Sequence, residues 1–211
     1  MTALPRFIAV EGAIGVGKTT LCKRLAEHFG ADTMLEAPSE NPFLPRFYQN
    51  PKRYAFKTQL TFLVQRVEQI KRMIKADGLI LSDYMLAKEQ IFAKLTLDKE
   101  ELALYNTFYE ALTAQLPKPD LVVYLQAPVD VLIQRIQHRA RDYEQTMDVD
   151  YLRHLHEQYS KFFHDYHDSS LIIINNTAIN IVQNEADFVQ LADFIAQNPK
   201  GRHFLNPLSY A

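Results

Sequence analysis

Short apolar runs along the chain predict buried strands. Five such runs occur, namely FIAV (Phe7–Val10), TMLE (Thr33–Glu36), LILS (Leu79–Ser82), LVVYL (Leu121–Leu125) and LIIIN, which starts at Leu171. They do not alternate polar with apolar residues, which is typical of parallel strands whose two faces are both covered by helices. The runs therefore indicate a sheet buried in the middle of the molecule.

The segments between these runs have helical spacing. Apolar residues recur every three or four positions in Arg53–Lys75, and the same spacing is found in Lys99–Gln115 and Asp148–His167. Strands that alternate with helices predict an α/β fold with a doubly wound, five-stranded parallel sheet flanked by helices. The length of 211 residues favours a single domain over residues 1–211. The stretch 199–211 is rich in Pro, Gly and Asn, and we expect a loosely attached tail there.

Composition narrows the possible partners and location. The net charge of −2 offers no basic footprint for a nucleic acid polymer. No apolar stretch reaches the ~18 residues of a membrane-spanning helix, and nothing near the start resembles a signal peptide. A single cysteine, Cys22, excludes an internal disulfide and fits a reducing compartment. We therefore expect a cytoplasmic protein that binds neither membrane nor nucleic acid.

A phosphate-binding loop follows the first predicted strand. Gly12-x-x-x-x-Gly17-Lys18-Thr19 matches the P-loop pattern, with an amphipathic helix directly after it. Glycines let backbone amides surround phosphates, and the helix points its positive end at the anion. Lys18 would reach the β- and γ-phosphates, and the Thr19 hydroxyl would bind Mg²⁺. The predicted nucleotide-binding residues are Gly12, Ala13, Ile14, Gly15, Val16, Gly17, Lys18, Thr19 and Thr20.

Two carboxylates lie at the carboxyl ends of other predicted strands. Glu36 ends the second strand and Asp83 follows the third. In open α/β sheets, ligands bind at the carboxyl ends of strands. Beside a P-loop, one carboxylate can accept a hydroxyl proton while the other positions Mg²⁺. The simpler alternative, in which each only caps the next helix, is less favoured for the two together.

A group of arginines follows the fourth strand. Arg135 and Arg139 are four residues apart, which places them on one helix face, and Arg141 lies two residues further on. Arginines that converge on a transferring phosphoryl group would neutralise its charge. We expect an arginine-rich lid over about residues 135–147, although a solvated basic helix end would have the same pattern.

Five blocks together resemble the deoxycytidine/deoxyguanosine/deoxyadenosine kinase family, and its bacterial branch in particular. They are EGAIGVGKTT, ENPFLPRFYQNPKRYAFKTQ, SDYMLAKEQIFAKL, QLPKPDLVVYLQAP and RIQHRARDYEQ, in family-like order from about Phe7 to Ile195. The resemblance implies ATP-dependent phosphorylation of a deoxynucleoside 5′-hydroxyl with Mg²⁺, in nucleotide salvage, by a homodimer that pairs through a helical face. It favours purine substrates, with deoxyadenosine as the first candidate, and deoxycytidine is the next candidate after them.

The resemblance also implies residue roles. Glu36 resembles the general base, and Gln59 the amide that pairs with the nucleobase. Tyr48 and Glu144 resemble the pair that holds the 3′-hydroxyl. Further substrate contacts are implied for Arg66, Asp83, Lys88 and Phe92, and the catalytic set is Glu36, Lys18, Asp83, Arg135, Arg139 and Arg141, with Thr19 and Asp83 at the metal.

The chain departs from the family after the third strand. Many members have Glu-Arg-Ser or Asp-Arg-Ser there, whereas this chain has Ser82-Asp83-Tyr84 and so lacks the arginine. Lys88 could stand in for that arginine beside the base carboxylate, or it could replace an aspartate near the nucleobase.

Two rival functions share the P-loop. A thymidylate-kinase-like nucleoside monophosphate kinase would need a cationic acceptor pocket where this chain offers Glu36. A regulatory nucleotide-binding module would have no need for Glu36, Gln59 and Tyr48 together.

Overall fold

A six-stranded parallel sheet forms the centre of the protein in the computed structural model, which describes residues 4–75, 77–139, 147–177, 181 and 184–205. The strand order is β2-β3-β1-β4-β5-β6. The strands are β1 (Phe7–Glu11), β2 (Asp32–Met34), β3 (Ile80–Ser82), β4 (Leu121–Gln126), β5 (Ser170–Asn175) and β6 (Arg202–Leu205). Because β3 and β4 lie on opposite sides of β1, the strand order reverses at β1, where ligands bind in such sheets.

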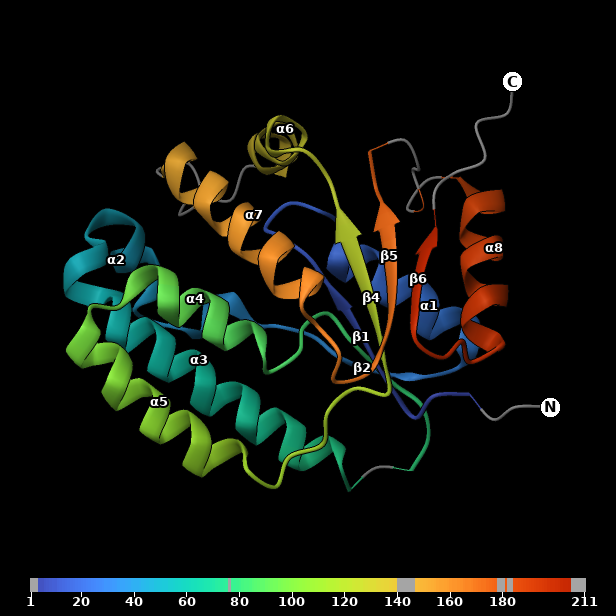
Figure 1. Ribbon diagram of the computed structural model, residues 1–211, viewed down its shortest axis with the longest axis horizontal. Coiled ribbons are helices and arrows are strands. Elements are labelled where there is room, and N and C mark those ends of the chain that lie inside the picture. Colours follow the sequence, from blue (N-terminus) through green and yellow to red (C-terminus); the bar gives the residue numbers. More distant parts are fainter. Residues whose placement is uncertain (1–3, 76, 140–146, 178–180, 182–183, 206–211) are drawn as a thin grey trace.

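Helices cover both faces of this sheet (Figure 1). Helices α1 and α8 lie on one side, and α3, α4, α5 and α7 lie on the other. Their bounds are α1 (Lys18–Phe29), η1 (Pro38–Glu40), α2 (Leu44–Gln49), α3 (Pro51–Met73), α4 (Lys88–Thr96), α5 (Lys99–Thr113), α6 (Val129–Arg139), α7 (Val149–His164) and α8 (Glu185–Ala196). The α/β class and the doubly wound parallel sheet are confirmed, and no helix in the described ranges is long and apolar enough to cross a membrane.

The prediction of five strands is wrong, because the sheet has a sixth. Strand β6 pairs in parallel with β5, with Leu171 opposite Arg202 and Ile174 opposite Leu205. An edge strand is held by backbone hydrogen bonds and does not need an apolar run, so this strand had no clear sequence signal. The expected loose tail therefore includes an ordered strand at 202–205, and residues 206–211 lie outside the described part.

Two element boundaries matter for the site. Strand β2 ends at Met34, so Glu36 lies two residues beyond the strand instead of ending it. Helix α3 begins at Pro51, where a missing backbone donor costs nothing, and the Asn50 side chain accepts from the Arg53 amide. The buried residues of α3 include Gln59, Arg66 and Ile70, so one face of this helix carries both core and polar side chains.

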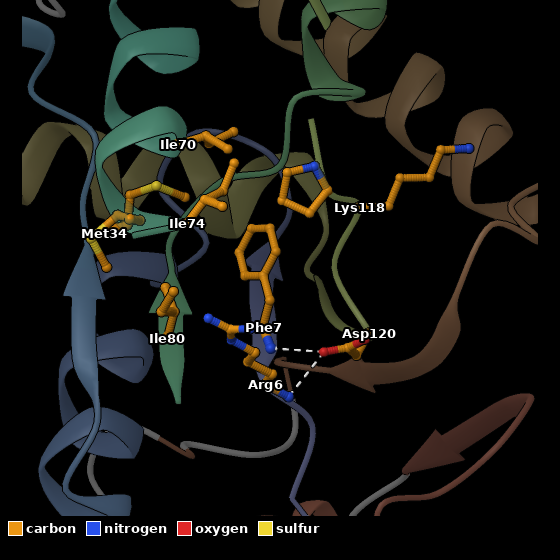
Figure 2. Close-up of a pocket in the computed structure, with 10 residues that line it drawn as sticks. Arg6, Phe7, Met34, Ile70, Ile74, Ile80, Lys118 and Asp120 are labelled. Carbon is orange, nitrogen blue, oxygen red and sulfur yellow. Dashed lines mark hydrogen bonds between the residues drawn. The ribbon is translucent and has the colours of Figure 1, made fainter. Parts of the chain in front are cut away.

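An apolar hollow separates α3 from the amino-terminal ends of β1 and β3. Phe7, Met34, Ile70 and Ile80 line it together with neighbouring side chains, and its volume is about 200 Å³. At its rim the Asp120 carboxylate accepts from the backbone amides of Arg6 and Phe7, both at 2.9 Å, as Figure 2 shows. This contact joins the start of β1 to the start of β4, at the end of the sheet opposite to the P-loop.

Candidate active site

The P-loop connects β1 to α1 and is packed under helix α6. Gly12 has φ +147°, and Gly15 and Gly17 also have positive φ values that favour glycine. The Lys18 ammonium donates to the carbonyls of Gly12 at 2.8 Å and Ala13 at 3.2 Å, so the side chain curls back over the loop. Burial and the nearby Lys88 lower the pKa of Lys18. The ammonium therefore lies over the loop at the start of α1, the end of a helix that favours anions.

Gly12→Ala should destabilise this loop strongly. A Cβ on Gly12 would lie 2.5 Å from the Leu125 carbonyl oxygen, and its φ is strained for any other residue. We expect a loss of about 2 kcal/mol or more in unfolding free energy, measured by denaturant titration. Gly78→Ala is the matched control, because Gly78 has φ +120° with no heavy atom within 4 Å of its Cβ. Equal losses in the two variants would contradict a packing role for Gly12.

A pocket of about 310 Å³ opens beside the P-loop. Of the predicted residues, those that line it are Ile14, Gly15, Gly17, Lys18, Thr19, Thr20, Glu36, Tyr48, Gln59, Arg66, Asp83, Lys88, Phe92, Arg135 and Arg139. Gly12, Ala13 and Val16 belong to the loop but are buried and do not line the pocket. Arg141 and Glu144 lie outside the described residues, as does most of the segment expected to form the lid.

Glu36 stands between two cations in this pocket. Its Oε1 accepts from the Lys88 ammonium at 2.9 Å and also contacts the Arg66 guanidinium. Burial raises the pKa of the Glu36 carboxyl, but Lys88 and Arg66 lower it by more, so that the pKa lies well below its ordinary value. Glu36 is therefore ionised throughout the physiological pH range.

Lys88 donates to the Glu36 carboxylate, which is one of the two placements that the sequence left open. Helix α4 begins at Lys88, which brings the ammonium to Glu36 from the β3 side. Its ammonium also lies 5.6 Å from the centre of the Tyr84 ring and 5.9 Å from that of Phe92.

Asp83 joins the two halves of the pocket. Its Oδ2 accepts from the Thr19 hydroxyl at 2.5 Å, and its Oδ1 accepts from the Glu36 backbone amide at 2.7 Å. A hydroxyl and a carboxylate side by side at a P-loop are hard oxygen ligands that suit Mg²⁺ shared with phosphates and water. A protein cage of three or more acidic, His or Cys ligands is not found among the described residues, and Mg²⁺ does not require one.

The sequence reasoning missed several residues of this site. Glu11 is fully buried and accepts from the amides of Gly12 at 3.1 Å and Met85 at 2.8 Å, which ties the P-loop to the segment after β3. Burial raises the pKa of Glu11, against the lowering effects of Lys88 and Lys18. Asn176 donates to the Val16 carbonyl at 2.6 Å, and Arg135 donates to the same carbonyl at 3.3 Å. Only the position of Glu11 directly before Gly12 could have pointed to such a role.

The wall of the pocket opposite the P-loop is mostly aromatic, and α3 adds polar groups to it. Phe47, Phe62, Tyr151 and Tyr159 line it in addition to the predicted aromatic residues. The Thr58 hydroxyl and Arg66 Nε have no hydrogen-bond partner among the described residues, although both are buried. Buried polar atoms left without partners are costly, which fits a wall that a polar, planar ligand completes.

A P-loop, a carboxylate–hydroxyl pair and an ionised carboxylate around one pocket fit a P-loop phosphotransferase. The sequence model of the deoxynucleoside kinase family matches residues 8–198. The chain belongs to this family, and is therefore a kinase with an alcohol group as acceptor.

The similar proteins are named as deoxynucleoside kinases, and a solved structure of one of them has the same fold. The chain is 32% identical to a deoxyguanosine kinase of Bacillus subtilis, over 90% of this chain and 96% of that protein. It is 31% identical to a deoxyadenosine kinase of Lactobacillus acidophilus, over 84% of this chain and 88% of that protein. The solved structure of a deoxyadenosine kinase from M. mycoides with bound dATP superposes with a TM-score of 0.79 at 26% identity, and covers 88% of this chain and 98% of that one.

Proposed function

We propose that the protein transfers the γ-phosphoryl group of ATP to the 5′-hydroxyl of a purine deoxynucleoside, deoxyadenosine first, with other deoxynucleosides as weaker substrates. The observation that carries this proposal is the ionised Glu36 carboxylate, which lines the same pocket as Lys18 of the P-loop. An ionised carboxylate can take the proton that a hydroxyl acceptor gives up. This reaction belongs to nucleotide salvage, and a single domain would carry both substrate sites.

The P-loop side of the pocket would hold the donor. Backbone amides at the start of α1 and the Lys18 ammonium would bind the β- and γ-phosphates. Thr19 and Asp83 would hold Mg²⁺, which when bound offsets the charge of the phosphates. Arg135 and Arg139, with Arg141, would approach the equatorial oxygens of the transferring group from α6 and the lid beyond it.

The α3 side would hold the acceptor. Gln59 is 3% exposed and lines the pocket, where its amide can donate and accept at a base edge. Phe92 would stack on the base, and Arg66, in the wall beside Glu36, would also contact the substrate. Tyr48, with Glu144, would hold the 3′-hydroxyl.

The proton balance requires one base. As the 5′-oxygen bonds to the γ-phosphorus and the β–γ bridging bond breaks to release ADP, Glu36 accepts the hydroxyl proton. The low pKa of Glu36 keeps the carboxylate ionised at neutral pH, as a proton acceptor must be. A loose transition state makes the hydroxyl acidic only late, so a weak carboxylate base is sufficient.

A panel of acceptors tests the proposal. The protein is incubated with ATP and Mg²⁺ together with each of the four deoxynucleosides, or with dTMP, and products are separated by chromatography. We expect 5′-monophosphates from deoxynucleosides, with the highest kcat/KM for deoxyadenosine. Product from dTMP alone would indicate a monophosphate kinase, and no product from any acceptor would indicate a regulatory module.

We also propose that the enzyme is a cytoplasmic homodimer. Leu104 and Phe108 are one turn apart on α5 and are 50% and 40% exposed, and Val64 on the neighbouring α3 is 41% exposed. A second copy of the chain, paired through this helical face, would cover them. The free, buried thiol of Cys22 fits a reducing location.

Substitution of this face should break the dimer. In the Leu104→Glu and Phe108→Glu double variant, buried charges would oppose pairing, and we expect the mass of a monomer by light scattering. The double variant Lys99→Glu and Glu100→Lys, at the exposed start of α5, is the control and should stay dimeric. A dimer that survives the apolar substitutions would exclude this face.

A further inference from the structure

Glu89 is a buried carboxylate that neither half of the reaction uses. It follows Lys88 in the first turn of α4 and is 0% exposed. It does not belong to the lining of the pocket, so a bound substrate would not touch it. A carboxylate buried to this extent is costly unless it is paired and hydrogen-bonded.

The partners of Glu89 lead to the active site. Its Oε1 contacts one terminal nitrogen of Arg66, whose other terminal nitrogen contacts Glu36. On the far side, the Tyr105 hydroxyl of α5 donates to Glu89 Oε2 at 3.1 Å. The Arg66 guanidinium is thus shared between two carboxylates, one at the active site and one behind it.

Because a guanidinium is rigid, sharing it between two carboxylates fixes its orientation. Its nitrogens lie in one rigid plane, so a contact that fixes one terminal nitrogen also orients the other. Arg66 side-chain exposure is 5%, and aromatic rings lie near its guanidinium, with Phe62 centred 4.5 Å away. Glu89 therefore limits how Arg66 can turn within the wall of the pocket.

Charge balance points the same way. The cluster contains two carboxylates, Glu36 and Glu89, and two cations, Arg66 and Lys88. Without the charge of Glu89, Arg66 would be directed at Glu36 alone, and the carboxylate that must accept a proton would be held more tightly.

We propose that Glu89 is a positioning residue for phosphoryl transfer, which acts through Arg66 to set the orientation and availability of Glu36. The chain Tyr105–Glu89–Arg66–Glu36 then runs from α5, across α4 and α3, to the carboxylate after β2. This inference rests on the proposed role of Glu36 as the base.

Glu89→Gln tests it, because glutamine keeps the shape and an oxygen acceptor but removes the charge. A merely structural role would be largely preserved by the amide, whereas we expect kcat to fall about 10- to 100-fold with KM for the deoxynucleoside changed less than about threefold. Lys94→Gln, an exposed charge removal further along α4, is the control. Wild-type kcat in Glu89→Gln would overturn the proposal.

A double-mutant cycle shows whether the effect passes through Arg66. In an Arg66→Met background, Glu89→Gln should lower kcat by no more than about twofold further, because its route to Glu36 is already lost. Full additivity of the two losses would overturn the proposal. Tyr105→Phe keeps the packing and removes one hydrogen bond to Glu89, so it should lower kcat about threefold. This variant tests the proposal even if Glu89→Gln folds poorly, and an unchanged kcat would contradict the proposal.

Failure of the underlying function would look different. If Glu36→Gln keeps near-normal turnover, Glu36 is not the base, whatever Glu89 does. If Glu36→Gln is inactive while Glu89→Gln and Tyr105→Phe are as fast as wild type, the base stands and Glu89 has no positioning role.

Discussion

Glu36→Gln should nearly abolish turnover and leave substrate binding largely intact. Glutamine fills the same volume and can still accept from Lys88 and Arg66, but it cannot accept the 5′-hydroxyl proton. Loss of a general base costs about 10²- to 10⁴-fold in rate. We expect the loss of kcat to lie near the upper end of this range. Among the described residues, Asp83 is the one other carboxylate that lines the pocket, and it already accepts from Thr19 and from a backbone amide. Initial rates with saturating ATP and deoxynucleoside measure this.

The controls separate chemistry from binding and folding. Deoxynucleoside affinity, measured by calorimetry, should change less than about threefold, because the base and sugar contacts are elsewhere. Glu40→Gln removes an exposed carboxylate four residues along the chain and should be as active as wild type. A Glu36→Gln enzyme with more than about a tenth of the wild-type kcat would remove Glu36 as the base.

Lys18→Met should give the second-largest loss. Methionine keeps an unbranched side chain of similar length while the ammonium, which the phosphates need most in the transition state, is removed. We expect kcat/KM for ATP to fall about 10²- to 10³-fold, since one preorganised donor is worth about that much. In the free protein, Lys18 donates to the Gly12 and Ala13 carbonyls, so the substitution also loosens the loop.

Lys23→Met is the matched control for Lys18→Met. Lys23 lies on the same helix and is exposed, away from the pocket lining, so its removal should leave kcat/KM unchanged. Melting temperatures of both variants show whether any loss follows from unfolding. If Lys18→Met retains wild-type kcat/KM, phosphate binding at this loop does not depend on the lysine.

Local patterns predicted the parts of this protein that depend on neighbouring residues. The P-loop is a contiguous stretch between a strand and a helix, so its glycines, Lys18 and the first turn of α1 could be recognised in order. Buried parallel strands need apolar residues on both faces, and this is why β1, β3, β4 and β5 were visible as runs. Strand β6 was missed because its half-exposed edge position accepts residues such as Arg202 and His203.

Boundaries at the site were harder to predict. The apolar run Thr33–Glu36 suggested a strand that ends on the carboxylate, but pairing with β3 stops at Met34, opposite Ser82. The two residues that follow let the Glu36 amide turn to the Asp83 carboxylate. Where a strand ends is decided by its neighbour in the sheet, which its own residues do not reveal.

The arrangement of charges around Glu36 depends on contacts between distant segments. The sequence allowed Lys88 either beside the base carboxylate or near the nucleobase, and Arg66 resembled only a substrate contact. Folding brings both onto Glu36, across separations of 52 and 30 residues. Glu89 had no sequence signal, because a carboxylate next to a lysine is an ordinary helix-surface pattern.

The sequence by itself therefore determined the α/β class, the phosphate loop and the family of this protein, because each is written in contiguous residues or in their periodic spacing. Only the tertiary structure decided which cations hold Glu36, how Asp83 links Thr19 to the acceptor side, and that Glu89 stands behind Arg66. Such pairings form when burial excludes water and leaves each charge to find its partner among the groups that the fold brings within reach.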